Sequence, residues 1–358
     1  MTAQKSAAWA HAKEVLRWSP DRKVDAVDVL SAALGMAAPV ALGVYAGMPP
    51  AGLAAALGGL AASRAQPRGD FAARTGQSAA VLIPVICAVI FTIAGDDRGW
   101  IKDFLRLVAV SIAALVGSYS RSMAMTGTRF IVFVVIMHAM PEMNVAGGAV
   151  LLALVLIGAL WTRGLGWALR AFAGRDDNMA PDERERPHGS MRQRIARWRR
   201  SLGSLAGWSY SIRITTGLAV SVVLEHLWPS HHLHWVGLTV VLLTPRHREL
   251  LSPKTTQRAI GTAIGVTATG IALRAGLPMW AFVVAIALLA GLRPLLHAGN
   301  YLLYSVVMTP LVILVIDAGH VPEFGLLLDR LFATALGAAL VVAASAALTG
   351  LARKPAQA

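Results

Sequence analysis

Long apolar stretches separated by short polar or Gly- and Pro-containing stretches run through most of the chain. Each stretch is flanked by charged residues, proline or glycine. In the first half they are approximately 27–46, 49–63, 76–94, 104–118, 123–140 and 147–169, and in the second half 212–228, 233–244, 259–275, 277–296, 301–317 and 326–348. Because a helix needs about 20 residues to cross the hydrocarbon core, the pattern predicts an all-α polytopic membrane protein with about 12 transmembrane helices.

The two sets of six segments resemble each other. Arg74-Thr-Gly-Gln-Ser-Ala opens the third segment of the first half, and Arg258-Ala-Ile-Gly-Thr-Ala opens that of the second. Six is an even number, which predicts two parallel six-helix repeats related by an axis along the membrane normal. The second segment of each half is short or broken by Gly and Pro, which is typical of a transporter's substrate site. Chance in a chain with 33 glycines and 17 prolines is the alternative.

The polar stretches divide the chain into five parts. They are a cytoplasmic lead (1–23), a first membrane half (24–170), a basic linker (171–209), a second membrane half (210–350) and a cytoplasmic tail (351–358). In the linker Ile195, Trp198 and Leu202 recur at helical spacing among arginines. This pattern predicts an interfacial helix on anionic lipid, and a solvated basic loop is the alternative.

Composition and charge exclude a soluble enzyme. Only 15% of the residues are charged, against about 25% in soluble domains, and the mean hydropathy is +0.59. The net charge of +14 follows from topology, since both termini inside would place 27 of the 33 Lys and Arg residues on the cytoplasmic side. We therefore predict a multi-pass protein of a bacterial cytoplasmic (inner) membrane, with both termini cytoplasmic and no nucleic-acid partner.

The second half contains several short sequence motifs in a fixed order. They are His234-Trp-Val-Gly-Leu-Thr-Val-Val-Leu-Leu-Thr-Pro245, Gln257-Arg-Ala-Ile-Gly-Thr-Ala-Ile-Gly265, Gly299-Asn-Tyr, Met308-Thr-Pro310 and Arg330-Leu-Phe-Ala-Thr-Ala-Leu-Gly337. This half, over about residues 220–348, resembles the fusaric acid resistance protein-like family, which is grouped with aromatic acid exporters and, more distantly, with aluminium-activated malate transporters of plants. The resemblance implies export of organic acids by a membrane transporter.

Cations and hydrogen-bonding groups near the segments are candidates for binding an organic anion. Arg129 lies roughly two turns inside an apolar segment, where a cation is costly and usually faces a cavity or a partner. Arg258 and its repeat counterpart Arg74 would form a cationic vestibule. The alternatives are a structural ion pair or snorkelling for Arg129 and snorkelling to lipid phosphates for Arg258.

The other half of the predicted repeat would add polar and aromatic contacts. Asn300, Tyr301 and Tyr304 can supply hydrogen bonds and ring faces, with an interfacial belt as the alternative for Tyr301. Trp235 and Thr239, in the first resembling phrase, complete the candidate substrate contacts, and Trp235 also fits an interfacial anchor.

Energy coupling needs a group that changes its charge. Glu225 and Asp317 end two segments and are the proton-coupling candidates, although a solvated loop carboxylate fits each of them as well. The outer cluster His231, His232 and His234 lacks a nearby Cys or paired acid ligand. We therefore predict no metal site, and the absence of a nucleotide-binding or nucleophile motif predicts no cofactor and no enzymatic activity.

The sequence thus favours a transporter that exports organic, above all aromatic carboxylic, acids. The alternatives are an anion channel and a non-transporting scaffold or lipid-interacting component. The predicted partners are the organic anion and membrane lipids, and the sequence leaves open a homo-oligomer or an accessory efflux subunit.

Overall fold

The computed structural model describes most of the chain as helix. It describes residues 18, 24–63, 71–95, 99–138, 147–174, 190–229, 231–244, 246, 253–276, 278–316 and 324–353. These residues form thirteen helices and no strand. The all-α prediction is therefore confirmed.

Each predicted segment coincides with one helix. The bounds are α2 Ala26–Tyr45, α3 Pro49–Ala62, α4 Phe71–Gly95, α5 Trp100–Val116, α6 Arg121–His138, α7 Gly148–Phe172, α8 Met191–Leu202, α9 Leu205–Leu227, α10 His234–Leu243, α11 Pro253–Arg274, α12 Met279–Gly299, α13 Tyr301–Ile316 and α14 Phe324–Arg353. Helices α4, α9 and α11 begin five to seven residues before the apolar segments predicted for them. The added first turn is polar in α11 but largely apolar in α4 and α9, and backbone hydrogen bonding continues through either kind of residue.

The chain forms two compact units. Unit 1 comprises Met1–Pro67, Glu142–Asp176 and Leu251–Leu331, and unit 2 comprises Arg68–Pro141, Asp177–Leu250 and Phe332–Ala358. Each unit therefore takes helices from both halves of the sequence, and the long helix α14 begins in unit 1 and continues in unit 2.

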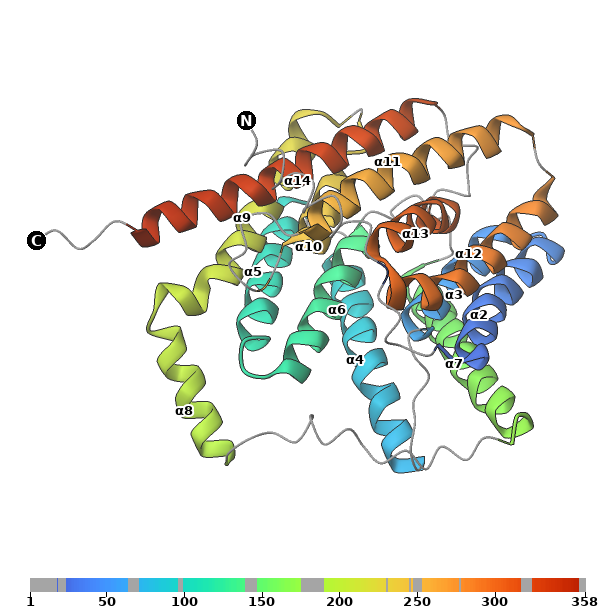
Figure 1. Ribbon diagram of the computed structural model, residues 1–358, viewed down its shortest axis with the longest axis horizontal. Coiled ribbons are helices and arrows are strands. Elements are labelled where there is room, and N and C mark those ends of the chain that lie inside the picture. Colours follow the sequence, from blue (N-terminus) through green and yellow to red (C-terminus); the bar gives the residue numbers. More distant parts are fainter. Residues whose placement is uncertain are drawn as a thin grey trace, which may run out of the picture. The chain divides into compact units, whose positions relative to one another are not determined.

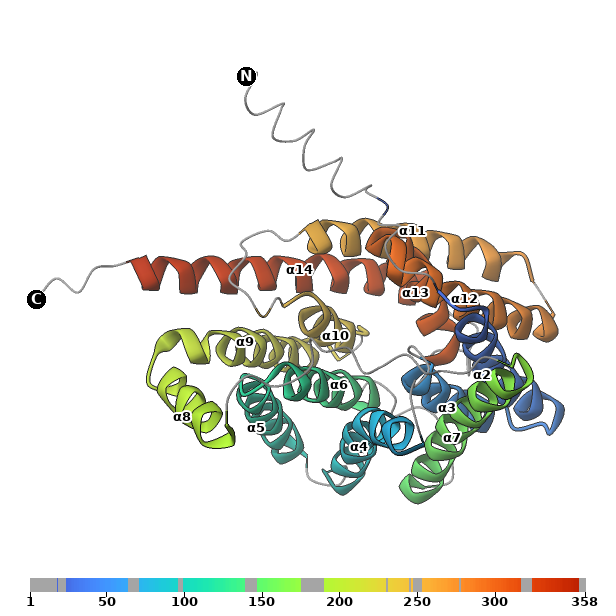
Figure 2. The same ribbon diagram turned by 60° about the horizontal axis from the view of Figure 1, so that its bottom comes forward.

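In unit 1, helices α2, α3 and α7 pack against one another, as Figures 1 and 2 show. Helix α13 packs on α11 and α12, and α12 also packs on α2. Glycines allow the closest of these contacts, because a Cβ at Gly58 would overlap the carbonyl oxygen of Val155, and a Cβ at Gly158 would overlap that of Ala55. Helices α3 and α7 thus meet backbone to backbone.

Unit 2 has helix pairs of its own. Helix α6 packs on α4 and α5, helix α9 packs on α10, and α5 also packs on α9 (Figure 2). A Cβ at Gly337 of α14 would lie 2.7 Å from the Thr239 Cβ, so α14 approaches α10 closely as well. Close approaches at glycine therefore occur in both units.

The two shortest apolar helices are the most enclosed. In α3 all residues from Gly52 to Ala62 are buried, and in α10 all from Trp235 to Val241 are buried. At 1.5 Å per residue, α10 is about 15 Å long, roughly half the hydrocarbon thickness of about 30 Å. Neither helix therefore spans a bilayer alone, and each is surrounded by longer helices.

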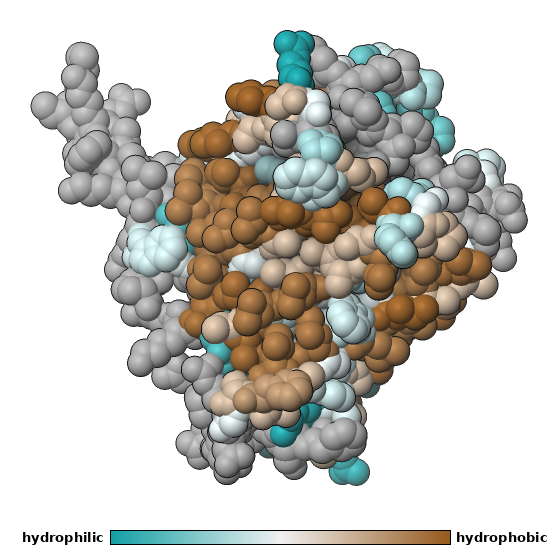
Figure 3. Space-filling view, turned by 90° about the vertical axis from the view of Figure 1, so that its right-hand side faces the viewer, coloured by the Kyte–Doolittle hydropathy of each residue, from teal (hydrophilic) through white to brown (hydrophobic). Residues whose placement is uncertain are grey.

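Five helices of the described residues are long and apolar enough to cross a membrane. They contain the stretches Ala26–Tyr45, Arg74–Gly95, Gly148–Phe172, Met279–His297 and Leu327–Leu348. Large apolar side chains lie exposed on them, among them Leu42, Ile83, Leu160 and Leu288. In Figure 3 brown apolar side chains cover a broad continuous area of one face, and the teal side chains lie mostly towards its margins. A wide apolar surface with polar margins fits contact with lipid.

Candidate functional site

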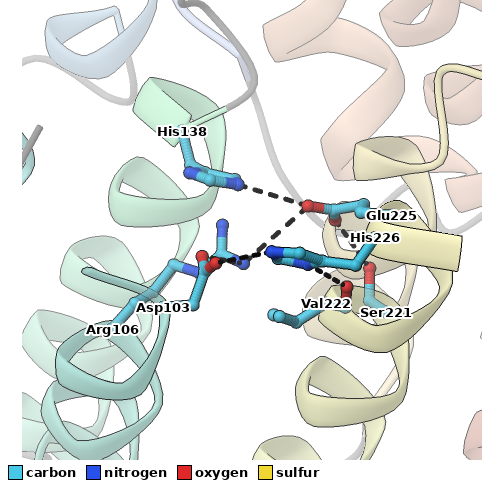
Figure 4. Close-up of polar contacts among 7 residues, drawn as sticks. All are labelled: Asp103, Arg106, His138, Ser221, Val222, Glu225 and His226. Atoms are coloured by element: carbon cyan, nitrogen blue, oxygen red, sulfur yellow. Dashed lines mark hydrogen bonds and ion pairs between the residues drawn. The ribbon is translucent and has the colours of Figure 1, made fainter. Parts of the chain in front are cut away.

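A network of ionisable side chains joins three helices of unit 2 (Figure 4). Its members are Asp103, Arg106, His138, Ser221, Glu225 and His226, which we call the acid–histidine cluster. Helix α5 supplies Asp103 and Arg106 from its first two turns, α6 supplies His138 as its last residue, and α9 supplies the remaining three from its last two turns.

Glu225 is the member with the most partners. Its Oε2 lies 3.2 Å from the His138 Nε2 and 3.9 Å from the Arg106 Nη2, and its Oε1 accepts a hydrogen bond of 3.1 Å from the Ser221 hydroxyl. Arg106 Nη2 also lies 3.2 Å from Asp103 Oδ1. Arg106 therefore stands between the two carboxylates and links α5 to α9.

Exposure falls from one edge of the cluster to its centre. The His226 side chain is 62% exposed, and its Nε2 lies 3.7 Å from Asp103 Oδ2. The side chains of His138 and Glu225 are 21% and 19% exposed, and that of Arg106 only 7%. Glu225 is thus enclosed rather than solvated as a loop carboxylate would be, and its role in proton coupling stays a prediction.

Sequence reasoning found Glu225 but missed Asp103, Arg106 and His138 as its neighbours. One signal was available, because Asp103 and Arg106 have the i, i+3 spacing that puts two side chains on one helix face, and Arg106 is a cation in an apolar segment. No pattern pointed to His138, which comes from a segment far along the chain.

Arg129 faces the neighbouring helix α4. Its Nη1 donates a hydrogen bond of 2.9 Å to the carbonyl oxygen of Ala80. Pro84, inside α4, has no N–H to donate to the carbonyl four residues earlier, which is that of Ala80. Arg129 therefore replaces a missing helix hydrogen bond, and binding of a substrate anion by Arg129 stays a prediction.

Arg258 lies on α11 and is only 6% exposed. Three residues further on, Gly261 meets α13, because a Cβ there would lie 2.6 Å from the Ser305 Cβ and 2.8 Å from the Leu302 carbonyl oxygen. Gly261 therefore packs directly against α13. By helix geometry Arg258 lies near the level of the first turn of α13, enclosed by protein rather than reaching lipid.

The first turn of α13 brings three predicted residues together. The Asn300 side-chain oxygen accepts hydrogen bonds from the backbone N–H groups of Leu302 and Leu303, at 2.8 and 3.2 Å, and so caps the helix. The rings of Tyr301 and Tyr304 stack with centroids 5.6 Å apart, and Tyr304 also meets the His297 ring edge-on. The structure thus gives Asn300 a capping role and assembles a small aromatic group beside it.

Trp235 and Thr239 lie inside unit 2. Trp235 is 2% exposed, so its interpretation as an interfacial anchor is wrong: close packing of α10 among longer helices encloses the ring. The Thr239 hydroxyl donates a hydrogen bond of 2.9 Å to the Trp235 carbonyl oxygen of its own helix.

The remaining predicted positions are spread over the chain. Arg74 is half-buried near the start of α4, and Asp317 lies outside the described residues. His232 and His234 have ring centroids 6.0 Å apart at the start of α10. Among the residues that the structure describes, no group of three or more His, Cys, Asp or Glu is arranged to hold a metal ion.

Arg246, which the sequence did not single out, directly follows the motif of residues 234–245. Arg246 Nη2 donates hydrogen bonds to the Ala124 carbonyl oxygen (2.9 Å) and the Thr128 hydroxyl (3.3 Å), and its guanidinium lies 4.4 Å from the centre of the Tyr210 ring. Burial lowers the pKa of Arg246 from its ordinary value, and the nearby Tyr210 acts in the opposite direction. Arg246 thus fixes the segment after α10 to α6 and α9.

Comparison with known proteins gives one match. Residues 218–344 match the family described as fusaric acid resistance protein-like, which nearly coincides with the stretch carrying the sequence resemblance. Searches of the curated proteins and of the solved structures found no significant match. Together with the five apolar spans, the match marks an integral membrane protein and indicates a transport or efflux role rather than an enzymatic one. Residues 218–344, about a third of the chain, are thus similar to the fusaric acid resistance protein-like family.

Proposed function

We propose that the protein exports organic acids, above all aromatic carboxylic acids, across the cytoplasmic membrane of a bacterium. The observation that carries this proposal is the family match over residues 218–344, in a chain with five helices able to cross a membrane. The family's description names resistance to an acid, and export of the acid is the simplest way for a membrane protein to confer resistance.

The surroundings of Arg258 support an acidic, aromatic substrate. Arg258 is 94% buried, and no hydrogen bond or ion pair joins it to the described residues. A guanidinium pairs well with a carboxylate through two parallel hydrogen bonds. The nearby start of α13 adds the partial positive charge of a helix N-terminus, and the stacked Tyr301 and Tyr304 offer ring faces.

We also propose that the halves are two parallel repeats with both termini in the cytoplasm. The observation in favour is the set of helix pairs, which is shared by the two units when each helix is exchanged for its counterpart. If successive helices cross the membrane in alternate directions, contacting polar residues come to lie on the same side of it. Asp28 and Arg170 then lie inside, and Asp103 and Glu225 lie outside. The exposed arginines of α8 would then meet anionic lipid on the cytoplasmic side.

Substitution of Arg258 tests the proposed function. In inverted membrane vesicles with matched expression, we expect Arg258→Gln to lower uptake of a labelled aromatic acid about 10-fold or more, the loss that follows from a charged hydrogen bond. Arg258→Lys keeps the charge without the planar fork and should fall between. Arg199→Ala, an exposed position on α8, is the matched control and should transport like the parent.

The same assay separates the alternatives. Uptake by Arg258→Gln equal to that of the parent would remove Arg258 from the substrate site. Accumulation of the acid above its outside concentration distinguishes a transporter from a channel, because a channel only equilibrates. A parent protein that moves none of the tested acids contradicts the proposed function itself.

A further inference from the structure

The acid–histidine cluster gathers at one end of three helices. Asp103 is in the first turn of α5, His138 ends α6, and Glu225 is in the last turn of α9. On the proposed topology α6 and α9 end outside and α5 begins outside, so all three helices place the cluster on the outer side. A proton moving inward in exchange for an exported acid would meet this end of the protein first.

The charges of the cluster do not balance without a bound proton. Asp103 and Glu225 each carry one negative charge, and Arg106 carries one positive charge. With both histidines neutral the cluster therefore has a net charge of −1. A single proton on His138, which is hydrogen-bonded to Glu225 at 3.2 Å, brings the net charge to zero. An uncompensated buried charge is costly, and one proton on this pair would balance the charges of the cluster.

Other ionisable groups near the cluster belong to the packed helices. On α5, Lys102 precedes Asp103, and adjacent residues of a helix do not face each other. On the α10 side the chain carries His231, His232 and His234. The described part of α4 has no Asp, Glu, Lys, Arg or His near its C-terminal end. Among the described residues, the charged groups that contact Glu225 are therefore members of the cluster.

We propose that the acid–histidine cluster binds the proton whose inward movement drives export, with the His138–Glu225 pair as its site. The proposal rests on the proposed export function. Water outside reaches His226, the 62% exposed member, and the proton settles on the enclosed pair. No bond other than those to the proton is made or broken.

Protonation changes the attraction between two helices. When His138 is protonated, it compensates Glu225, and Arg106 is held mainly by Asp103 of its own helix, at 3.2 Å. When His138 is neutral, Arg106 is the one permanent cation for both carboxylates of the cluster. It then draws Glu225 of α9, now 3.9 Å away, towards α5. The bound proton thus sets how tightly α5 and α9 hold together, which is how a proton can bias a transporter between two conformations.

Transport by Glu225→Gln in vesicles gives the first test. We expect this variant to lose accumulation of a labelled aromatic acid driven by an imposed pH gradient, by about 10-fold or more. Exchange of labelled for unlabelled acid at equal pH should stay within about twofold of the parent, because exchange needs no net proton movement. Arg199→Ala, an exposed position on α8 outside the cluster, is the control and should keep gradient-driven accumulation.

Thermal unfolding of the purified full chain in detergent gives a second test that needs no substrate. Acidification from pH 8 to pH 5.5 covers the range over which histidine takes up a proton. A proton on His138 then compensates Glu225 in the parent, whereas in Glu225→Gln the same proton has no carboxylate beside it to compensate. We therefore expect acidification to shift the Tm of the parent upward relative to that of Glu225→Gln by about 2 °C or more. A network that holds the helices together without binding a proton would not produce this difference.

Each contrary result has its own meaning. Gradient-driven accumulation by Glu225→Gln equal to that of the parent overturns the proposal, and so does loss of exchange together with accumulation in a folded variant. A parent that transports acids without any dependence on the pH gradient also overturns it, while the export function stands. If the parent transports no acid, the export function fails, and an equal Tm response of the two proteins then rejects proton binding as well.

Discussion

Units 1 and 2 place the charges of their helix pairs differently. In unit 1 the pair α2–α12 has its Asp, Arg and His side chains only towards its predicted cytoplasmic end, namely Asp28, Arg293 and His297. In unit 2 the pair α9–α5, its counterpart in the predicted repeat, carries the acid–histidine cluster at its predicted outer end. The difference teaches that the proposed proton site belongs to unit 2 alone, whereas the proposed substrate contact Arg258 belongs to unit 1.

The predicted cytoplasmic ends show the same contrast in a milder form. In unit 1, Asp28 of α2 pairs with Arg170 of α7 at 3.1 Å, and both side chains are less than 10% exposed. In unit 2 the counterpart helices α9 and α14 are joined by a hydrogen bond of 3.4 Å from Arg213 Nη1 to the Ser345 hydroxyl. An ion pair in one unit thus corresponds to a bond between a cation and a neutral group in the other.

Breaking these two contacts should give the largest difference in stability. Asp28→Asn removes one partner of a buried ion pair and should lower the free energy of unfolding by about 3–5 kcal/mol. Ser345→Ala removes a long hydrogen bond and should cost about 0.5–1.5 kcal/mol. Thermal unfolding followed by tryptophan fluorescence in detergent measures both.

A double variant checks the cause. In Asp28→Asn/Arg170→Met neither charge remains, so most of the lost stability should return. A double variant as unstable as Asp28→Asn alone, or equal losses for Asp28→Asn and Ser345→Ala, would show that the two units do not differ in this contact.

The helices could be predicted from the sequence far better than the site. Apolar runs located twelve helices, because such runs favour burial in lipid or protein. The capping box of Ser190 and Gln193 fixes the start of the thirteenth, α8, where the spacing of Ile195 and Trp198 placed it. The cluster depends on residues up to 123 positions apart, Asp103 and His226, and no local period encodes which helix ends meet.

The interpretation of single residues failed where burial decided. Tryptophan is a residue type that often anchors a helix at a membrane interface. The helix α10 is short, however, and the Trp235 ring is enclosed by protein. The sequence correctly indicated that Arg129 is a cation that needs a partner. Its contact with the Ala80 carbonyl could not be predicted, because that contact depends on how α4 and α6 pack.

Arg129 allows a test of intermediate size that separates a structural role from binding. Arg129→Gln removes a charged donor from the Ala80 carbonyl and should cost about 1.5–3 kcal/mol. Pro84→Ala supplies the missing backbone N–H, so Arg129→Gln should cost clearly less stability in a Pro84→Ala protein than in the parent. Thermal unfolding of the parent, the two single variants and the double variant gives the coupling energy. If Arg129 also binds the exported acid, the double variant regains stability but still transports poorly. Equal costs on both backgrounds would contradict the structural role.

Unit 1 contains the matched control for this cycle. Pro39 of α2 frees the Gly35 carbonyl. The Thr162 hydroxyl of α7 shares its one hydrogen between that oxygen, at 3.2 Å, and the Gly158 carbonyl oxygen of its own helix, at 2.9 Å. Because this donor is neutral, Thr162→Val should cost only about 0.5–1.5 kcal/mol. A loss as large as that of Arg129→Gln would mean that charge does not distinguish the two proline sites.

The smallest expected effect concerns helix α8, which packs on α9 in unit 2. Trp198 Nε1 donates hydrogen bonds to the Leu115 carbonyl oxygen (3.2 Å) and the Ser118 hydroxyl (2.9 Å), so the indole fixes α8 to the end of α5. Trp198→Phe keeps a ring but loses the donor, and should cost about 0.5–1.5 kcal/mol. Because this energy holds one helix rather than the whole fold, it should appear mainly as faster trypsin cleavage at the exposed arginines of α8.

The control for α8 is Trp161→Phe in unit 1, where the indole donates to the Leu34 carbonyl oxygen at 3.3 Å. This variant loses a donor of the same kind far along the chain from α8, so cleavage of α8 should stay at the parent's rate. Faster cleavage in both variants would point to a general loosening of the protein. Faster cleavage in Trp198→Phe alone would show that α8 is held by its own contact with α5, and an unchanged rate in Trp198→Phe would show that other contacts hold it.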